Sequence, residues 1–281
     1  MRITNPPCVV SFAGTDPSGG AGIQADIKAI SATGSYAASI ITALVAQNTC
    51  GVQSILDIPP AFVTQQADAV FDDLAIKAVK IGMLHNQEII DVVAATIEHR
   101  KPQHVVFDPV MVAKNGCSLI DPTTLDFLKQ RLLPHVTLIT PNLHEAEKLL
   151  HTQITNLDEM ALAAITLAKQ FNIDVLVKGG HLTSQKSSDV LYCHSNQQQY
   201  WFHANRIETK NTHGTGCTLS SAIASYLAQE YAVNDAIEAA KQYLTRAIES
   251  GSQFNIGHGH GPVDHFFNIY SSDETTIQSH E

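Results

Sequence analysis

Residues 214–217 read Gly-Thr-Gly-Cys and directly precede an apolar helical pattern. Gly214, Thr215 and Gly216 leave several backbone N–H groups free at the start of that helix, and the helix dipole adds to their positive potential. Cys217 falls in the first turn, where the same field lowers a thiol pKa from about 8.5. The spacing equally fits a small residue packed into the first turn. The segment therefore predicts an anion site and leaves a reactive role for Cys217 open.

A second glycine-rich stretch, residues 14–22, follows the first apolar run of the chain. It is not a Walker A loop, because glycine stands where that motif has lysine, and it does not match GxGxxG. Its glycines, Gly14 first, favour either a tight strand-to-helix turn or a close approach of backbone amides to a small ligand. Asp26 follows at the edge of an apolar stripe of isoleucines. Its carboxylate is either an ordinary boundary residue or an acceptor for a buried ligand amine.

Three further polar motifs follow apolar runs typical of strands. Asp108 opens the segment DPVM, Glu145 ends PNLHE, and Lys178 ends DVLVK before two glycines. Ligands of open α/β sheets bind beyond the carboxyl ends of the strands, so we expect these side chains to meet at one sheet edge. Beside an anion-binding helix terminus, Lys178 is a candidate phosphate contact, although a surface lysine would show the same pattern.

The chain contains 14 histidines, and His258, His260 and His265 lie close together near its end. Such a cluster could hold a metal ion. No HExxH motif is present, however, and glycine-rich loops often carry unpaired histidines. We therefore expect no zinc site in this segment.

Short apolar runs alternate with longer amphipathic segments, which predicts βαβ units and a mainly parallel sheet. Asp121-Pro122 supports one helix start, as an N-cap followed by proline. The expected parallel strands are Cys8–Ala13, Ala38–Ala43, Ile76–Ile81, His104–Phe107, Thr137–Thr140 and Asp174–Val177, and the expected antiparallel edge strands are Asp189–His194 and Gln198–His203. The expected helices are Gly22–Thr33, Ala61–Leu74, Gln87–Arg100, Thr123–Leu132, Leu143–Leu150, Leu157–Phe171, Gly216–Gln229 and Asp235–Ser250.

Charge and cysteine content exclude several classes of function. The 281 residues carry 17 Lys and Arg against 27 Asp and Glu, a formal net charge of −10. That field repels nucleic-acid phosphates and anionic lipid heads, so we expect neither nucleic acid nor membrane as partner. No stretch approaches the ~20 apolar residues of a membrane span, and the start of the chain has no signal-peptide core. Five cysteines without a CxxC indicate reduced thiols, so we expect a cytoplasmic protein.

Taken together, eight motifs resemble the bacterial hydroxymethylpyrimidine/phosphomethylpyrimidine kinases, the thiamine-pathway branch of the ribokinase-like fold. The motifs are GTDPSGGAGIQADIKA, ITALVAQNT, KIGML, FDPVMVAK, TPNLHEAE, VKGGH, NTHGTGCTLSSAIA and GHGHGPVDHF. The resemblance implies an α/β fold, a three-layer αβα sandwich with a mainly parallel central sheet and a small antiparallel edge. It implies one kinase domain over residues 1–270, followed by a polar tail at 271–281. It also implies a homodimer, for which the extension at 189–203 is one candidate contact.

The resemblance further implies two successive ATP-dependent phosphorylations in one site. The 5-hydroxymethyl group of 4-amino-5-hydroxymethyl-2-methylpyrimidine is phosphorylated first, and the monophosphate then becomes the diphosphate used for thiamine phosphate synthesis. By resemblance, the pyrimidine-binding positions are Gly14, Asp26, Gln47 and Met83.

The remaining matches concern ATP and magnesium. Asp108 and Glu145 match acidic positions that organise Mg²⁺, a hard cation that keeps much of its water. Lys178 and Thr215 match nucleotide-binding positions, Gly214 to Gly216 match the anion hole, and Cys217 matches the proposed catalytic base. Many ribokinase-like kinases carry aspartate at that last position, where this chain has cysteine. Segments 49–54 and 114–118 are candidate lids over the site.

Three alternatives remain at this stage. A pyridoxal kinase would share the fold and a substrate of similar shape. Gln47, Met83 and the QNT segment favour the pyrimidine, and activity on both substrates stays open. A dinucleotide-dependent oxidoreductase would need the GxGxxG fingerprint, which the sequence lacks. A non-catalytic pyrimidine sensor would require loss of Lys178, the acids or the anion hole, and all of these are retained.

Overall fold

The structure is a computed structural model that describes residues 5–111, 120–180 and 186–270. The expected tail at 271–281 and the candidate lid at 114–118 lie outside the described residues. The strands are β1 (Cys8–Ala13), β2 (Tyr36–Ile41), β3 (Ala43–Asn48), β4 (Gly51–Asp57), β5 (Ile76–Ile81), β6 (His104–Phe107), β7 (Leu138–Ile139), β8 (Asp174–Lys178), β9 (Lys186–Cys193) and β10 (Gln198–Asn205). The helices are α1 (Gly22–Ala32), α2 (Pro60–Asp73), α3 (Gln87–Arg100), α4 (Pro122–Arg131), α5 (Leu143–Leu150), α6 (Leu157–Phe171), α7 (Thr215–Ala228), α8 (Val233–Gly251) and α9 (Phe267–Tyr270), with a 3₁₀ turn η1 at Leu133–His135.

The central sheet has eight strands in the order β10-β9-β8-β7-β6-β5-β1-β2. The pairs from β8 to β2 are parallel, whereas β9 pairs antiparallel with β8 and with β10. A mainly parallel sheet with an antiparallel edge is therefore confirmed. In such a sheet the carboxyl ends of β1, β5, β6 and β8 face the same edge, which is where the polar motifs follow.

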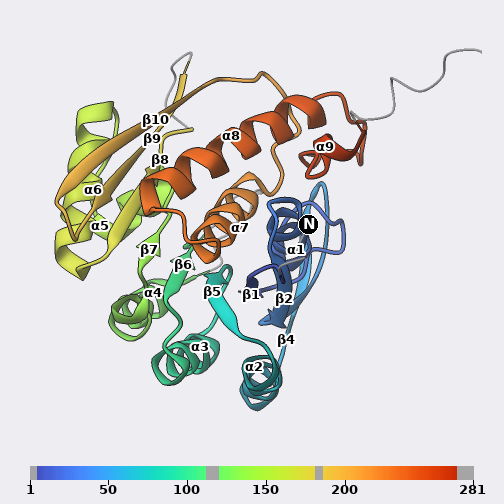
Figure 1. Cartoon of the computed structure of the whole chain (residues 1–281), viewed down its shortest axis with the longest axis vertical. Helices are drawn as coiled ribbons and strands as arrows, with labels where there is room; N and C mark the ends of the chain where they lie inside the picture. The colour runs from blue at the N-terminus through green and yellow to red at the C-terminus, as the bar shows by residue number, and fades with distance from the viewer. Residues whose placement is uncertain (1–4, 112–119, 181–185, 271–281) are drawn as a thin grey trace, which may run out of the picture.

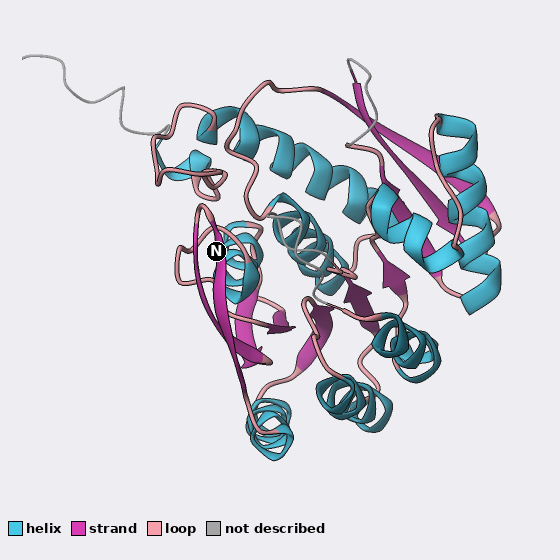
Figure 2. Ribbon diagram, turned by 180° about the vertical axis from the view of Figure 1, so that it is seen from behind, coloured by secondary structure: helices cyan, strands magenta, loops and turns pink. Residues whose placement is uncertain are grey.

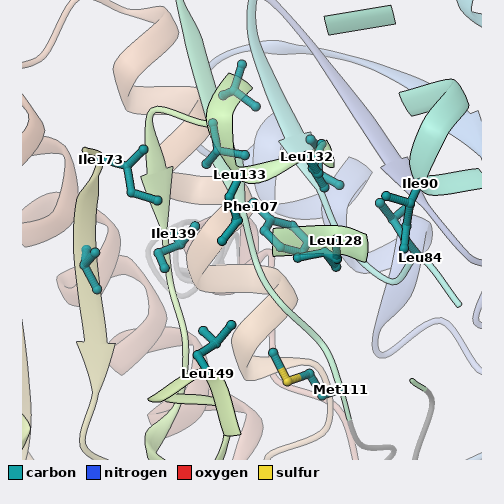
Figure 3. Close-up of a cluster of buried hydrophobic side chains, with 14 of the residues drawn as sticks. Leu84, Ile90, Phe107, Met111, Leu128, Leu132, Leu133, Ile139, Leu149 and Ile173 are labelled. Atoms are coloured by element: carbon teal, nitrogen blue, oxygen red, sulfur yellow. The ribbon is translucent and has the colours of Figure 1, made fainter. Parts of the chain in front are cut away.

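Helices cover both faces of this sheet (Figures 1 and 2). The core on one face joins α1, α7 and α8 to the strands through residues such as Ile30, Leu219 and Ile237. The core on the opposite face joins α2 to α6 to the strands. Figure 3 shows part of that second core, where Phe107 of β6 and Ile139 of β7 lie near Leu128 and Leu133. The three-layer αβα arrangement is therefore confirmed, and within the described ranges no helix has both the length and the apolarity to cross a bilayer.

Local capping explains why several helix bounds match the expected ones. Asn86, Asn142 and Asn156 each accept a hydrogen bond from a backbone N–H in the first turn of α3, α5 and α6. Asp121 caps α4 in the same way, followed by proline in the first turn. Asn and Asp at the N-cap satisfy backbone donors that the helix leaves free. These caps fix the starts of the helices at the sheet edge.

The hairpin formed by β3 and β4 differs from the sequence prediction. We expected one strand over Ala38–Ala43, but β2 ends at Ile41 and the chain turns at Thr42. There the Thr42 N–H donates to Ala13 O and the Thr42 hydroxyl donates to Met83 O. The chain then forms a separate two-stranded antiparallel sheet, β3-β4, which contains the candidate lid segment 49–54 in its turn and in β4. An apolar run that continues across the turn hides this break in the sequence.

Candidate active site

A cavity of about 1110 Å³ opens at the carboxyl ends of the strands. Ligand cavities commonly measure about 300–1,000 Å³, so this one has room for two small molecules side by side. Its wall includes Gly14, Gln47, Met83, Asp108, Glu145, Lys178, Gly214, Thr215, Gly216 and Cys217. The structure thus brings together every residue that the sequence placed in the site, with the exception of Asp26.

The N-terminus of α7 forms one end of the cavity. Gly214 is its N-cap and adopts a φ of 77°, which favours glycine. A β-carbon at Gly214 would stand 1.8 Å from the carbonyl oxygen of Gly20, so the two glycine-rich loops pack directly on each other. The first turn of α7 contains no acidic residue. Its free N–H groups therefore present positive potential to the cavity, and no carboxylate within the first turn itself reduces it.

Lys178 and Asp108 face this helix terminus. Lys178 Nζ lies 2.7 Å from Asp108 Oδ1, and their side chains are 14% and 3% exposed. A β-carbon at Gly216 would lie 3.2 Å from Asp108 Oδ2 and 3.4 Å from Lys178 Nζ, which places the pair directly beneath the α7 terminus. Burial opposes the charged form of Lys178, but Asp108 and Glu145 outweigh it and hold the pKa of Lys178 above its ordinary value. The lysine is therefore a permanent cation at the cavity wall.

Glu145 has both a structural contact and an electrostatic one. One of its oxygens accepts the Asn142 N–H at 2.7 Å, which closes the capping box of α5. Burial raises the pKa of Glu145 to about 7, Lys178 opposes this, and the neighbouring carboxylate of Asp108 adds to it. Two buried acids thus share one lysine. Oxygen donors with incomplete charge compensation fit a hard divalent cation that retains water ligands.

Another part of the cavity wall comes from the first glycine-rich loop and the β3-β4 hairpin. A β-carbon at Gly14 would approach the Met83 methyl group to 2.7 Å, so these two residues are in contact. The pairing register of the hairpin shifts between Ala46 and Gln47. Such an irregularity re-aims side chains locally, and Gln47 lies on the cavity wall. The thioether of Met83 and the amide of Gln47 suit a small heteroaromatic ring.

The structure corrects the expectation for Asp26. Its carboxylate is fully buried behind the cavity wall and accepts hydrogen bonds from Ser11, Ser221 and Lys80. Lys80 Nζ lies 2.8 Å from both carboxylate oxygens, and both side chains are 0% exposed. These partners occupy both oxygens of Asp26, so it supports the site from behind rather than facing the cavity. Lys80 itself lies on the cavity wall. A lone lysine inside the buried strand AVKI was the available signal for this pair.

The prediction that the helix terminus lowers the pKa of Cys217 is wrong. Burial raises the pKa of Cys217 to about 11, and the carboxylates of Asp26 and Asp108 add to this. Lys80 and the Gly22 N–H act in the opposite direction without reversing it. The thiol therefore carries its proton at neutral pH.

Sequence reasoning also missed Asp16, which joins the two glycine-rich loops. Asp16 is fully buried, and its Oδ2 lies 2.8 Å from His213 Nε2, one residue before Gly214. It also accepts hydrogen bonds from the Ser18 hydroxyl and the Ala21 N–H. Burial favours the neutral acid, but hydrogen bonds from His213, Ser18 and Gln47 outweigh it and hold the pKa of Asp16 well below its ordinary value. An aspartate before Pro-Ser in a glycine-rich turn was the signal.

The fold defines a ribokinase-like α/β protein, with a cavity at the carboxyl ends of the strands and a helix N-terminus on its wall. The chain belongs to the phosphomethylpyrimidine kinase family, whose profile matches residues 16–264. It is 48% identical over 258 residues to the hydroxymethylpyrimidine/phosphomethylpyrimidine kinase of Escherichia coli, covering 92% of this chain and 96% of that protein. It is also 48% identical over 257 residues to the thiamine biosynthesis bifunctional protein ThiED of Geobacter sulfurreducens, covering 92% of this chain and 52% of that protein.

Two solved structures are similar over nearly the whole chain. The ADP complex of a Bacillus subtilis pyridoxal kinase matches with a TM-score of 0.84 and 33% identity, covering 93% of this chain and 98% of that chain. A phosphomethylpyrimidine kinase from Clostridium difficile matches with a TM-score of 0.76 and 39% identity, covering 86% of this chain and 99% of that chain. These likenesses agree with the architecture of the fold.

Proposed function

We propose that this protein is an ATP-dependent kinase that phosphorylates hydroxymethylpyrimidine, and then its monophosphate to the diphosphate, for thiamine biosynthesis. One observation carries the proposal: Lys178, Asp108 and the α7 terminus meet at one end of a single cavity whose other side holds Gln47 and Met83. Family membership supports the same activity. Both steps are assigned to this one site, because the monophosphate keeps the pyrimidine ring that Gln47 and Met83 would contact.

The phosphates of ATP bind at the α7 end of the cavity. Lys178 neutralises them as a point charge, and Thr215 lies beside it on the nucleotide side. The free N–H groups from Gly214 to Cys217 stabilise the charge that develops on the transferring phosphoryl group. Phosphoryl transfer depends mainly on positioning and on neutralisation of charge, which is what these groups supply.

Asp108 and Glu145 are the residues that would hold Mg²⁺, through water as well as directly. Their partly compensated charge and their oxygen donors fit this ion. When bound, Mg²⁺ supplies charge neutralisation on the phosphate oxygens. Because the capping box engages one oxygen of Glu145, α5 fixes the orientation of this carboxylate.

Gly14, Gln47 and Met83 hold the pyrimidine with its hydroxymethyl group toward α7. Asp26 contributes indirectly, because it fixes Lys80 at the wall. Cys217 stands at the transfer end as the candidate base for the first step. The second step starts from an ionised phosphate oxygen and needs no base.

The test is product analysis with purified protein and MgATP, offered hydroxymethylpyrimidine, its monophosphate or pyridoxal in separate reactions. The proposal expects the diphosphate from both pyrimidines, formed faster than pyridoxal phosphate. Pyridoxal kinase activity is the second candidate, favoured by the TM-score of 0.84 to the Bacillus subtilis enzyme. Fast turnover of pyridoxal alone would reject the pyrimidine assignment.

We further propose one kinase domain over residues 1–270, a cytoplasmic location, and small molecules rather than nucleic acid or membrane as partners. We also infer a homodimer. The directly paired Leu44 and Leu56 of the hairpin are 45% and 65% exposed, which offers an apolar contact besides the β9-β10 extension. Light scattering of the wild type and Leu56→Lys tests this, since a monomeric wild type contradicts the dimer.

A further inference from the structure

The segment Gly257–Gly261 uses its backbone, rather than its histidines, to contact the β3-β4 hairpin. The Gly259 N–H donates to Thr49 Oγ1 at 3.1 Å, and the His260 N–H donates to Thr49 O at 3.0 Å. The side chains of His258 and His260 are exposed. Thr49 stands at the turn of the hairpin, so a segment from the end of the chain binds its tip.

The glycines of this segment allow the close contact. A β-carbon at Gly257 would come within 2.3 Å of Thr49 Oγ1, and one at Gly259 within 2.1 Å of Thr49 O. Gly257 also has a φ of 75°, which glycine adopts without strain. Any side chain at these two positions would push the hairpin tip away.

The far end of the same segment is fastened to the loop that leads into α7. The His213 N–H donates to Gly261 O at 3.0 Å, and a β-carbon at Gly261 would lie 2.2 Å from Asn211 Oδ1. His213 in turn pairs with the buried Asp16 at 2.8 Å. The segment therefore connects the hairpin tip to the residues just before Gly214.

The hairpin needs such a connection. Among the described strands, β3 and β4 pair with each other and with no third strand, and an isolated two-stranded hairpin is marginally stable. Its base is held by Thr15, whose N–H donates to Ala43 O and whose hydroxyl accepts the Val45 N–H. Its tip is held at Thr49. Gln47 lies two residues before Thr49 on the cavity wall.

We propose that Thr49, held by the backbone of Gly257–Gly261, is a positioning residue that sets the distance between Gln47 and the α7 terminus. This inference rests on the proposed function and assigns a role to the glycine-histidine segment within it. The contact secures the acceptor side of the cavity, and Lys178 and Asp108 at the nucleotide side lie on other elements. Loss of the Thr49 contact alone leaves the bond between His213 and Gly261 in place, so it weakens binding of the pyrimidine and leaves ATP binding intact.

Two variants test the contact by kinetics. Thr49→Val removes the hydroxyl acceptor, and we expect KM for hydroxymethylpyrimidine to rise roughly two- to tenfold, as for a lost neutral hydrogen bond. Gly259→Ala places a β-carbon against Thr49 O, and we expect a larger rise. KM for ATP stays within about twofold in both. Thr166→Val is the matched control, because this exposed threonine bonds only within α6, to Leu162 O. It should change neither KM.

A double-mutant cycle attributes the effect to the contact itself. Gly257→Ala meets the side chain of Thr49, so Thr49→Ala should relieve much of its effect. Additive effects of the two substitutions would contradict the contact. A rise in both KM values together with a lowered Tm would reduce Thr49 to a general structural residue and overturn the inference.

Hydrogen exchange separates this inference from the proposed function. In Gly259→Ala without ligand, amides at residues 51–54 should exchange faster than in the wild type, whatever the enzyme phosphorylates. Unchanged exchange there would overturn the inference. If the wild type turned over no pyrimidine while exchange changed as expected, the proposed function would fail, and with it the acceptor role of Thr49.

Discussion

Two of the lysine–aspartate pairs near the strand ends of the central sheet differ in their surroundings. Lys80 of β5 and Asp26 of α1 are both 0% exposed, and Ser11 and Ser221 complete the bonding of the carboxylate. The four side chains come from β1, β5, α1 and α7. Each partner is neutralised entirely by protein groups, so this pair ties elements together behind the cavity.

Lys178 and Asp108 form the second pair, which remains open to the cavity. Lys178 is 14% exposed, and Asp108 shares it with Glu145 while also accepting the Thr140 hydroxyl. The charges of this group are not fully matched within the protein. Both pairs consist of a lysine and an aspartate. Burial and neighbouring hydrogen-bond donors therefore decide that one pair supports the fold and that the other is available to bind phosphate.

Breaking the fully buried pair of Lys80 and Asp26 should cause the largest loss of unfolding free energy. Lys80→Met leaves the Asp26 charge buried without its cation, which costs about 3–5 kcal/mol of unfolding free energy. Urea denaturation measures this. Lys77→Met, an exposed lysine on the same strand, is the matched control and should change stability by less than about 0.5 kcal/mol.

Neutralising both partners should reverse most of that loss. Lys80→Met combined with Asp26→Asn removes the unpaired charge, and replacing a whole buried pair is often close to neutral. If the double variant were as unstable as Lys80→Met alone, packing rather than charge would explain the loss, and the comparison between the pairs would fail.

Breaking the open pair should affect catalysis more than folding. Lys178→Met removes a cation from the transferring phosphates, so kcat should fall about 10²–10³-fold. Stability should change less than in Lys80→Met, since Asp108 keeps the Thr140 hydroxyl and lies on the cavity wall. Steady-state kinetics measures kcat, and urea denaturation measures the unfolding free energy. Lys169→Met, which replaces an exposed lysine on α6, is the control. A Lys178→Met variant that loses as much unfolding free energy as Lys80→Met but retains the wild-type kcat would invert the assignment.

The acid of the open pair should govern the magnesium requirement. Asp108→Asn retains the shape of the side chain but removes its charge, and the Mg²⁺ concentration for half-maximal activity should rise about 10–100-fold. Titration of Mg²⁺ at saturating ATP measures the change. Asp126→Asn, an exposed residue on α4, should leave the requirement as in the wild type. An unchanged requirement in Asp108→Asn would remove this residue from the metal site.

Cys217, which lies near both pairs, should show the smallest effect at neutral pH. Its pKa of about 11 means that the thiolate fraction grows about tenfold per pH unit up to that value. At pH 7, Cys217→Ala should slow the first phosphorylation less than about tenfold and leave the second nearly unchanged.

Single-turnover rates of both steps between pH 7 and 9 test this role. The deficit of the Cys217→Ala variant in the first step should widen as pH rises, because the wild type gains thiolate and the variant does not. Equal slowing of both steps, or a deficit that is independent of pH, would exclude Cys217 as the base.

Much of the fold could be predicted from local signals. The helices α3, α5 and α6 follow the expected ranges because asparagine N-caps and left-handed C-cap residues mark both ends. The β3-β4 hairpin could not be predicted in the same way. Its apolar run continues from β2 without a glycine or proline, and the turn at Thr42 depends on tertiary bonds to Ala13 and Met83.

Site residues could be predicted where a polar or glycine-rich motif directly follows a strand. Asp108, Lys178 and the Gly214 loop satisfy that rule and meet in the cavity. Asp26 does not, because its environment depends on Lys80, a residue 54 positions away in the sequence. The prediction of a lowered Cys217 pKa was wrong, because burial by residues distant in the sequence raises this pKa.

Binding of MgADP by isothermal titration calorimetry tests the contrast between the two pairs most directly. Lys178→Met should raise the Kd for MgADP at least about tenfold, as expected for loss of a charge-assisted contact. The folded double variant Lys80→Met/Asp26→Asn should bind within a few-fold of the wild type. Retained affinity in Lys178→Met with lost affinity in the double variant would contradict the account.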